Sequence, residues 1–409
     1  MKNGWKTRRL EEVCSEITDG SHFSPKTTDS GFPYITVRDI ENDRIDFANC
    51  KFISTADYMQ LLNNGCRPYQ GNLLFSKDGT VGKVALVDYD KDFVVLSSLA
   101  IVRPDNRQIN SAFLKYVLKS RAFLDEAVGM KTGVAIRRII LRNLKSISIP
   151  VPPLPEQQRI VEILDEAFDG IAIAEANAES TLLRARAIFE SYVQSLFGKS
   201  ETGAAQKKLG DESLLEIIDG DRGVNYPKAS DFHDEEYCLF LNTKNVRPDG
   251  FNFETAMFIT AEKDRQLRKG KLTRDDVVMT TRGTIGNIGL YSEDIPFDNI
   301  RINSGMLIFR PNKRVLLPSF LFELLRSDIV KDQIRKYTTG AAQPQLPIKT
   351  LVDFTIPVPV NLAHQRELVK KLRAFEAESK QLVSIHEQKL TLFEALKESL
   401  LHQALTGKL

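Results

Sequence analysis

The sequence is poor in cysteine: it has four in 409 residues, and Cys14, Cys50, Cys66 and Cys238 form no CxxC pair. That spacing gives no basis for a disulfide framework or a cysteine-ligated zinc site, so we expect reduced thiols that are buried or incidental. Long apolar runs are also missing, and the sequence therefore predicts no membrane span. The first residues are basic without an apolar stretch, so we expect no secretory signal and a cytoplasmic location.

An excess of charge of one sign is absent as well, because 56 lysines and arginines stand against 54 aspartates and glutamates. The net charge of +2 does not by itself indicate a nucleic-acid partner, so any basic surface has to be local. An apolar content of 42% is typical of a folded protein. The length is enough for about two to four domains.

The motifs of common enzyme classes are missing too. There is no GxxxxGK[ST] phosphate loop, and GTIGNIG at 283–289 lacks the GxGxxG spacing and suits a hairpin turn. A pair of FxGxG and [ND]PP[YF] motifs, typical of amino-methyltransferases, is absent, and the five histidines show no HExxH spacing. Asp105 and Asp249 have no ExK partner for a nuclease core. We therefore predict a chain that is not catalytic and binds no metal or cofactor itself.

What the sequence does contain is a tandem repeat. The junction ISIPVPPLPEQQRIV, which begins at Ile147, returns as FTIPVPVNLAHQREL, which begins at Phe354. Three residue pairs are each 207 positions apart: Pro150 and Pro357, Pro152 and Pro359, Arg159 and Arg366. Further matches follow in the same order in both halves, among them EITDG with EIIDG and NLLFSKDGTVGK with DVVMTTRGTIGN. This shared order indicates a duplication.

Each half divides into a strand-rich part and one long helix. Short β-branched runs between glycine and aspartate turns predict the strands, and apolar residues three and four apart after each proline junction predict the helices. The expected fold class is α+β, with two similar strand-rich globular domains separated by two long antiparallel helices in a coiled coil and related by a pseudo-two-fold repeat. The expected boundaries are 1–150 and 201–357 for the globular domains and 151–200 and 358–409 for the helices.

The charges of the two helices suggest that they pair with each other. The first helix has eight acidic and four basic residues, and the second has eight basic and six acidic residues. Antiparallel pairing would place the globular domains at opposite ends. The apolar seam is expected to end at Tyr192 and Leu196 in the first helix and at Leu396 and Leu400 in the second. The alternative is that each helix pairs with a helix of another chain.

Two kinds of segment carry candidate DNA contacts. Basic residues cluster at 115–145 and at 262–274, and each cluster suits either phosphate contacts or an ordinary solvated helix face. The hairpin tips SKDGTVGK at 76–83 and TTRGTIGN at 280–287 place cations and amides beside exposed glycine backbone, although an ordinary tight hairpin would look the same. The full set of predicted DNA contacts is His22, Lys26, Arg38, Lys77, Thr80, Lys83, Lys131, Arg137, Arg138, Arg222, Lys244, Arg282, Thr284, Asn287, Gln343 and Gln345.

On its two proline junctions, its paired long helices and its two hairpin units, the chain resembles the specificity subunits of type I restriction–modification systems over essentially its whole length. The resemblance implies two target-recognition domains, each reading one half of a bipartite, asymmetric DNA site. It implies helices that set the spacing and dock two methyltransferase subunits, with or without two ATP-dependent restriction subunits. S-adenosylmethionine, ATP and Mg²⁺ are then expected on those partners.

The alternative reading is a structural coiled-coil adaptor with two protein-binding heads and no DNA recognition. A self-contained enzyme is a third reading, and it would need a catalytic constellation that the sequence does not show.

Overall fold

The structure is a computed structural model that describes residues 4–129, 139–198, 204–338 and 345–409. Backbone contacts divide it into two compact units. Unit 1 holds Met1–Glu179 and Glu387–Leu409, and unit 2 holds Ser180–His386. The long helices α5 (Leu154–Gly198) and α10 (Leu362–Leu405) each contribute to both units.

Unit 1 is built on two four-stranded sheets. One is antiparallel, in the order β2-β11-β8-β9, and the other has the order β10-β4-β7-β3, with β10 parallel to β4. Two small antiparallel pairs, β1-β12 and β5-β6, complete it. The strands are β1 (Lys6–Arg9), β2 (Cys14–Asp19), β3 (Thr27–Thr28), β4 (Phe32–Ile35), β5 (Ile40–Glu41), β6 (Arg44–Ile45), β7 (Lys51–Ile53), β8 (Leu73–Ser76), β9 (Val84–Leu86), β10 (Val94–Val95), β11 (Leu99–Pro104) and β12 (Ser148–Val151).

Unit 2 repeats this topology. Its antiparallel sheet has the order β14-β22-β19-β20, its mixed sheet has the order β18-β15-β21 with β15 parallel to β21, and β13-β23 and β16-β17 form the small pairs. The strands are β13 (Ala204–Lys208), β14 (Leu215–Asp219), β15 (Cys238–Leu241), β16 (Val246–Arg247), β17 (Gly250–Phe251), β18 (Phe258–Ile259), β19 (Val277–Thr280), β20 (Ile288–Leu290), β21 (Ile300–Ile302), β22 (Met306–Pro311) and β23 (Thr355–Pro359). Matching strand orders confirm the duplication that the sequence predicts.

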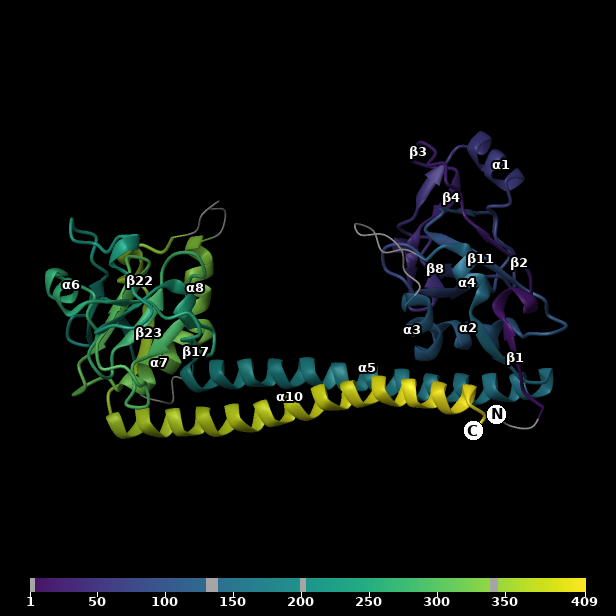
Figure 1. Cartoon of the computed structure of the whole chain (residues 1–409). Coiled ribbons are helices and arrows are strands. Elements are labelled where there is room, and N and C mark those ends of the chain that lie inside the picture. The colour runs from purple at the N-terminus through teal and green to yellow at the C-terminus, as the bar shows by residue number, and fades with distance from the viewer. Residues whose placement is uncertain (1–3, 130–138, 199–203, 339–344) are drawn as a thin grey trace. The chain divides into compact units, whose positions relative to one another are not determined.

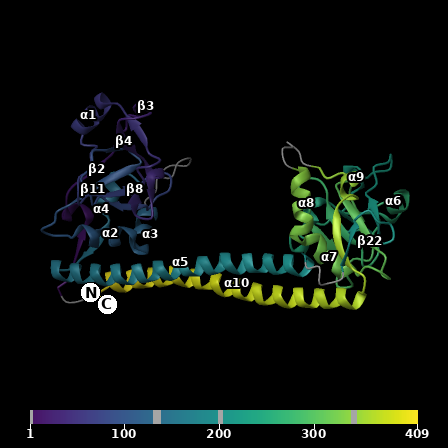
Figure 2. The same ribbon diagram turned by 180° about the vertical axis from the view of Figure 1, so that it is seen from behind.

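Short helices cover the antiparallel sheet of each unit. In unit 1, α2 and α3 lie between strands β8 and β11 and the adjoining part of α5 (Figures 1 and 2). In unit 2, α7 packs against β19, β20 and β22, and α8 packs against α7. Phe113 and Phe320, at matching positions in α2 and α7, are fully buried, each contributing about 1.5–3 kcal/mol. The short helices are α1 (Thr55–Asn63), α2 (Ser111–Lys119), α3 (Arg121–Gly129), α4 (Leu141–Ser146), α6 (Ala261–Gln266), α7 (Pro318–Arg326), α8 (Asp328–Thr338) and α9 (Ile348–Leu351).

A buried glutamine fixes the start of each long helix. Gln157 accepts a hydrogen bond from the Asn110 N–H at 2.7 Å and donates to the carbonyls of Gln108 and Pro152. Gln365 does the same with the Leu317 N–H at 2.9 Å and the carbonyls of Val315 and Pro359. Both side chains are 0% exposed. Each amide therefore satisfies backbone groups that the helix start and the adjoining loop would otherwise bury unpaired.

These two clamps correct the alignment of the junctions. Gln157 and Gln365 are 208 positions apart, and the buried trio Ile160, Val161 and Leu164 matches Leu368, Val369 and Leu372 with the same separation. The prediction that Arg159 and Arg366 are equivalent is therefore wrong by one residue. The second junction contains one additional residue between Pro359 and its clamp, which the matching letters conceal.

Within each unit the long helices run antiparallel. In unit 1 the ammonium of Lys397 in α10 pairs with the Glu175 carboxylate of α5 at 2.7 Å, and Arg159 donates to the Leu409 carbonyl at 3.0 Å. In unit 2 the ring of Phe375 stacks at 6.1 Å on Phe189 and contacts Tyr192 at 4.4 Å. The predicted pairing of the two helices in one chain is confirmed within both units.

The predicted seam is confirmed at Tyr192, which contacts Phe375, but it is wrong at Leu396. Leu396 is 45% exposed, while Leu401 and Ala404 are buried; in α5, Val193 and Phe197 are buried and Leu196 is only partly so. The helix ends turn these residues toward the strand-rich part of each unit, where Phe197, for example, contacts the Phe320 ring. A seam derived from periodicity alone considers only the partner helix.

Candidate nucleic-acid interface

The two predicted hairpin tips share one backbone design. In unit 1 the Ser76 hydroxyl donates to the Thr80 carbonyl and accepts from the Lys83 N–H. In unit 2 the Thr280 hydroxyl makes the same pair of contacts with the Thr284 carbonyl and the Asn287 N–H. A short hydroxyl side chain can close a turn in this way because it reaches nearby backbone groups. Both tips are thus held rigid from inside.

Two residues predicted to contact DNA also make hydrogen bonds that support these hairpins. The Lys83 ammonium donates to the Ile40 carbonyl at 2.6 Å, and the Asn287 amide donates to the Val246 carbonyl at 2.9 Å. Ile40 and Val246 are matching residues next to one-turn 3-10 helices at Val37–Asp39 and Thr243–Asn245. The Lys83 and Asn287 side chains are both half-buried, and both donate hydrogen bonds within the protein.

Lys77 is also occupied within the protein. Its side chain is 5% exposed, and its ammonium lies 3.2 Å from the Asp19 carboxylate and 3.7 Å from that of Asp78. The matching residue in unit 2 is Thr281, a buried neutral side chain whose hydroxyl donates to the Gly305 carbonyl. An ammonium buried between two carboxylates is held in place by the fold, and it is less suited to binding a phosphate than a mobile, exposed ammonium is.

The other predicted residues of unit 2 gather around the turn at Ser304 and Gly305. Arg222 donates to the Ser304 carbonyl at 3.4 Å, and a Cβ placed on Gly305 would lie 3.7 Å from the Cβ of Arg282. The same Cβ would lie 3.2 Å from the side chain of Thr243, the residue before Lys244. Gln345 forms a bridge with Arg282. The structure therefore brings the exposed side chains of Arg222, Lys244, Arg282 and Gln345 to one region.

Unit 1 has a matching region around Ser97 and Ser98. The Ser97 N–H donates to the Ser21 carbonyl at 2.8 Å, and the Lys77 N–H donates to the Ser98 carbonyl at 3.0 Å. The neighbouring His22 is exposed and lies 3.2 Å from Asp19. Thr80 and Arg38 are exposed, on the hairpin tip and on the 3-10 helix beside it.

The remaining predictions lie elsewhere. Lys26 is exposed beside β3 of the second sheet. The predicted contacts Lys131, Arg137, Arg138 and Gln343 fall outside the described residues.

Glycine is required where the DG motif of each unit passes the central turn. A Cβ on Gly20 would lie 2.4 Å from the Leu96 carbonyl oxygen, and a Cβ on Gly220 would lie 2.2 Å from that of Asn303. Real Cβ atoms do not approach backbone so closely, and only glycine fits. The repeated DG motif is therefore the point at which the chain packs against the turn, and the second residue after its glycine, His22 or Arg222, is exposed.

The structure adds two cations that were flagged only as part of a basic cluster. Arg268 and Lys269 line a cleft of about 380 Å³ together with Arg222 and residues 219–223. The sequence placed them in the run 262–274, but it gave no sign that Asp221, which follows the DG motif 47 positions before Arg268, contacts their loop. A comparison of the two halves could have singled out these two cations, because the first half has no cations at the matching positions.

The four cysteines are free thiols, and three of them are buried. Burial raises the pKa of Cys14 and of Cys238 to about 12. These two thiols are therefore protonated at neutral pH and are poor nucleophiles. Among the described residues, no group of three or more metal-ligating side chains occurs and no helix is long and apolar enough to cross a bilayer.

Each unit presents exposed polar side chains around one turn, which is the type of surface that contacts nucleic acid. The chain belongs to the type I restriction modification DNA specificity domain family, which matches residues 2–182 and 213–391. The predicted family, fold class and DNA-specificity function are thereby confirmed.

Individual relatives agree with this assignment. The putative type I restriction enzyme MjaX specificity subunit of Methanocaldococcus jannaschii is 24% identical over 432 residues, covering 99% of this chain and 93% of the relative. The type I restriction enzyme EcoBI specificity subunit of Escherichia coli is 22% identical, covering 100% of this chain and 87% of the relative. A solved chain of a type I R-M system has a TM-score of 0.77 at 17% identity, covering 100% of this chain and 99% of that chain, and supports the fold.

Proposed function

We propose that this chain is the DNA-reading specificity subunit of a type I restriction–modification complex. Each unit reads one half of a bipartite, asymmetric site, and α5 and α10 set the separation between the halves. The globular domains are residues 1–150 and 201–357, and the helical segments are residues 151–200 and 358–409. The chain works in the cytoplasm on double-stranded DNA.

The observation that carries this proposal is that the two units share one backbone arrangement at the hairpin tips but present different side chains there. Asp78 on the first hairpin tip stands where Arg282 stands on the second, and His22 stands where Arg222 stands. Both tips are closed by the same hydroxyl-to-carbonyl contact. Two readers that share a frame and differ at the surface are suited to two different base sequences.

The long helices support the docking of protein partners. Ile173, Leu183, Ile188 and Leu392 are between 58% and 68% exposed, on helices otherwise rich in charge. Exposed apolar residues of this size are typical of protein interfaces. We propose that two methyltransferase subunits dock there, with or without two ATP-dependent restriction subunits. S-adenosylmethionine, ATP and Mg²⁺ would be bound by those subunits, and this chain would contribute recognition without catalysis.

The test is an exchange of one reader. Residues 21–145 are replaced by the corresponding segment of another specificity subunit, and the complex is produced with its methyltransferase partner. Sequencing of methylated adenines in the host DNA should show one half of the recognised site changed and the other half retained.

The same assay distinguishes the alternative. A structural adaptor with two protein-binding heads would leave the methylated sequence unchanged after the exchange, and its complex would show no salt-dependent binding to duplex DNA. Methylation by the purified chain alone would instead indicate an enzyme.

A further inference from the structure

The cleft at Arg268 and Lys269 in unit 2 is built on a buried guanidinium. Arg301 is 6% exposed and donates to the Asp264 carboxylate at 2.5 Å. The same guanidinium donates to the carbonyls of Lys269 at 2.8 Å, Asp264 at 2.8 Å and Leu267 at 3.1 Å. A buried guanidinium with four acceptors holds its geometry because losing any of them would leave a charge poorly solvated. It therefore fixes the backbone of residues 267–269 from inside.

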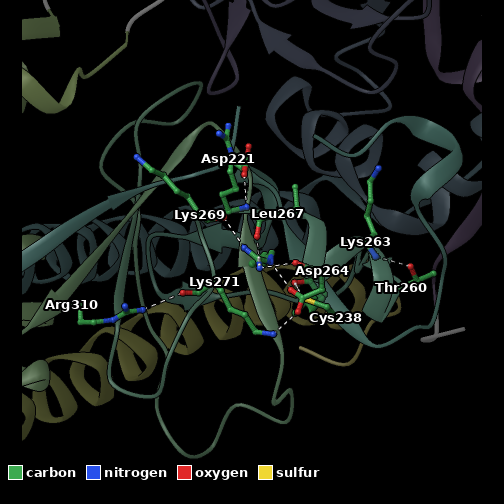
Figure 3. A network of polar contacts seen from close by, with 12 residues as sticks. Asp221, Cys238, Thr260, Lys263, Asp264, Leu267, Lys269, Lys271 and Arg310 are labelled. Atoms are coloured by element: carbon green, nitrogen blue, oxygen red, sulfur yellow. Dashed lines mark hydrogen bonds and ion pairs between the residues drawn. The ribbon is translucent and has the colours of Figure 1, made fainter. Parts of the chain in front are cut away.

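A buried carboxylate fixes the same loop from the other side. Asp221 is 5% exposed and accepts hydrogen bonds from the Gly223 N–H at 2.6 Å and the Arg268 N–H at 2.7 Å. Burial alone would raise the pKa of Asp221, but these N–H groups and that of Lys269 outweigh it and hold the pKa below its ordinary value. The carboxylate is therefore ionised at neutral pH and joins the DG motif to the loop. Figure 3 shows the Lys269 side chain extending away from this network.

Three exposed cations surround the cleft. Arg268 and Lys269 belong to the fixed loop, and Arg222 lies two residues after the glycine of the DG motif. Arg222 is paired with Asp219 at 3.3 Å, and Asp221 is occupied by backbone N–H groups, so three positive charges stand against two negative ones. A Cβ on Gly223 would lie 2.6 Å from a terminal nitrogen of Arg268. Glycine at this position leaves room for the guanidinium over the cleft.

Unit 1 lacks this arrangement at the matching place. The Val95 N–H donates to the Cys66 carbonyl, and the matching Ile302 N–H donates to the Gly270 carbonyl, so Cys66 corresponds to Gly270. Counting back from this pair, the positions of Arg268 and Lys269 are filled by Asn64 and Gly65. The loop of unit 1 is therefore neutral where that of unit 2 carries two cations.

We infer that this cleft binds a backbone phosphate of the DNA beside the half-site read by unit 2. The inference rests on the proposed function. Exposed cations on a rigid loop gain free energy when they bind a phosphate, because the counterions of the phosphate are released. They also lose little conformational entropy, because the backbone that carries them is already fixed. Position favours DNA as the source of the phosphate, because Arg222 also contacts Ser304, in the turn close to which Arg282 lies.

The experiment measures binding of the full complex, with its methyltransferase partner, to a duplex containing the sequence that it methylates. The Arg268→Ala/Lys269→Ala variant should bind about tenfold more weakly at low salt. The slope of log affinity against log salt concentration should become shallower by about 1 for each lost phosphate contact. The methylated sequence should not change. Arg314→Ala is the matched control, because this exposed arginine of unit 2 follows the far end of β22, and the wild-type slope is expected for it.

A second measurement locates the phosphate. Single phosphates of the duplex are replaced by neutral methylphosphonates, and one position should weaken the wild type but not the double variant. A double variant with the wild-type slope, or a scan in which no position distinguishes the two proteins, would overturn the inference and leave the proposed function intact. A changed methylated sequence would make these cations base readers and would also overturn it. Failure of the wild-type complex to bind any duplex would remove the proposed function and this inference together.

Discussion

At the scale of single residues, buried polar side chains hold the functional surfaces in place. Gln157 and Gln365 anchor the long helices, Arg301 and Asp221 anchor the cationic loop, and Lys77 is neutralised by Asp19. Each of these groups is satisfied on several sides, which makes its loss costly. The surface residues beside them can vary without disturbing the frame.

The glutamine clamps give a direct stability prediction. Gln157→Ala leaves the Asn110 N–H and the carbonyls of Gln108 and Pro152 without their partner, and we expect a loss of about 1–3 kcal/mol. Denaturant unfolding of the full chain measures it. Gln158→Ala is the control, because that neighbouring glutamine is exposed and should change stability little. Equal effects of the two substitutions would contradict the role of the clamp.

The Asp264 carboxylate gives unit 2 a dependence on pH. Burial would raise the pKa of Asp264, but Lys271 and Arg301 outweigh it and hold the pKa below its ordinary value. A depressed folded-state pKa means that the stabilisation is complete above the unfolded value of about 3.9 and is lost as the pH falls through the folded value.

Melting temperatures from neutral pH down to about pH 3 test this prediction. Asp264→Asn should cost about 3–5 kcal/mol at neutral pH, because it leaves Arg301 without its buried counterion. It should also flatten the acid part of the profile. Asp298→Asn is the control, because that carboxylate is 93% exposed. If Asp298→Asn flattened the acid part of the profile as much as Asp264→Asn does, the assignment of the pH dependence to Asp264 would be wrong.

At the scale of elements, the second hairpin tip allows a test of whether an exposed side chain reads DNA while a half-buried one supports the turn. Arg282→Ala should weaken binding to duplex DNA by about 1–3 kcal/mol if the guanidinium reads a base, and it should relax the methylated sequence in one half of the site only. Its melting temperature should equal that of the wild type, since the side chain is exposed. Anisotropy measurements and methylation sequencing report both effects.

The matched variant on the same hairpin is Asn287→Ala. Its amide supports Val246, so the substitution should lower stability by about 1 kcal/mol while the recognised bases stay the same. If Asn287→Ala changed the methylated sequence and Arg282→Ala did not, the assignment of Arg282 as the base-reading residue would be wrong.

The sequence predicted the elements better than the roles of their side chains. Repetition and apolar periodicity identified the two long helices, and the glycine-containing tips identified the two hairpins. Lys77 and Lys83 could not be assigned from the sequence, because their acceptors at Asp19 and Ile40 lie far along the chain. The sequence flagged Arg268 and Lys269 only within the basic cluster at 262–274. Their position beside a cleft could not be predicted for the same reason, because Asp221, the partner of the Arg268 N–H, is 47 positions away.

At the scale of the whole molecule, the two long helices continue from one unit into the other. Removal of one heptad from each helix should shorten both helices by about 10 Å. If the helices set the distance between the two half-sites, that distance should decrease by the same amount. This corresponds to about three base pairs of DNA. Deletion of residues 176–182 together with 384–390 keeps the heptad register of both helices.

Methylation sequencing of the deletion variant should show both half-sites unchanged and a spacer about three base pairs shorter. Insertion of one heptad in each helix is the complementary variant and should lengthen the spacer by the same amount. A spacer that stays constant in both variants would show that the helices do not measure the DNA.

The additional residue of the second junction limits how such a protein can exchange its readers during evolution. A crossover between gene copies within the proline segments transfers a complete junction, so the following helix keeps its rotational phase. A crossover at the look-alike arginines, Arg159 and Arg366, would add or remove one helical position, depending on which copy comes first, and rotate everything downstream by about 100°. The apolar face would then turn to solvent. The proline segments are therefore the places where one reading domain can replace another and leave the helices intact.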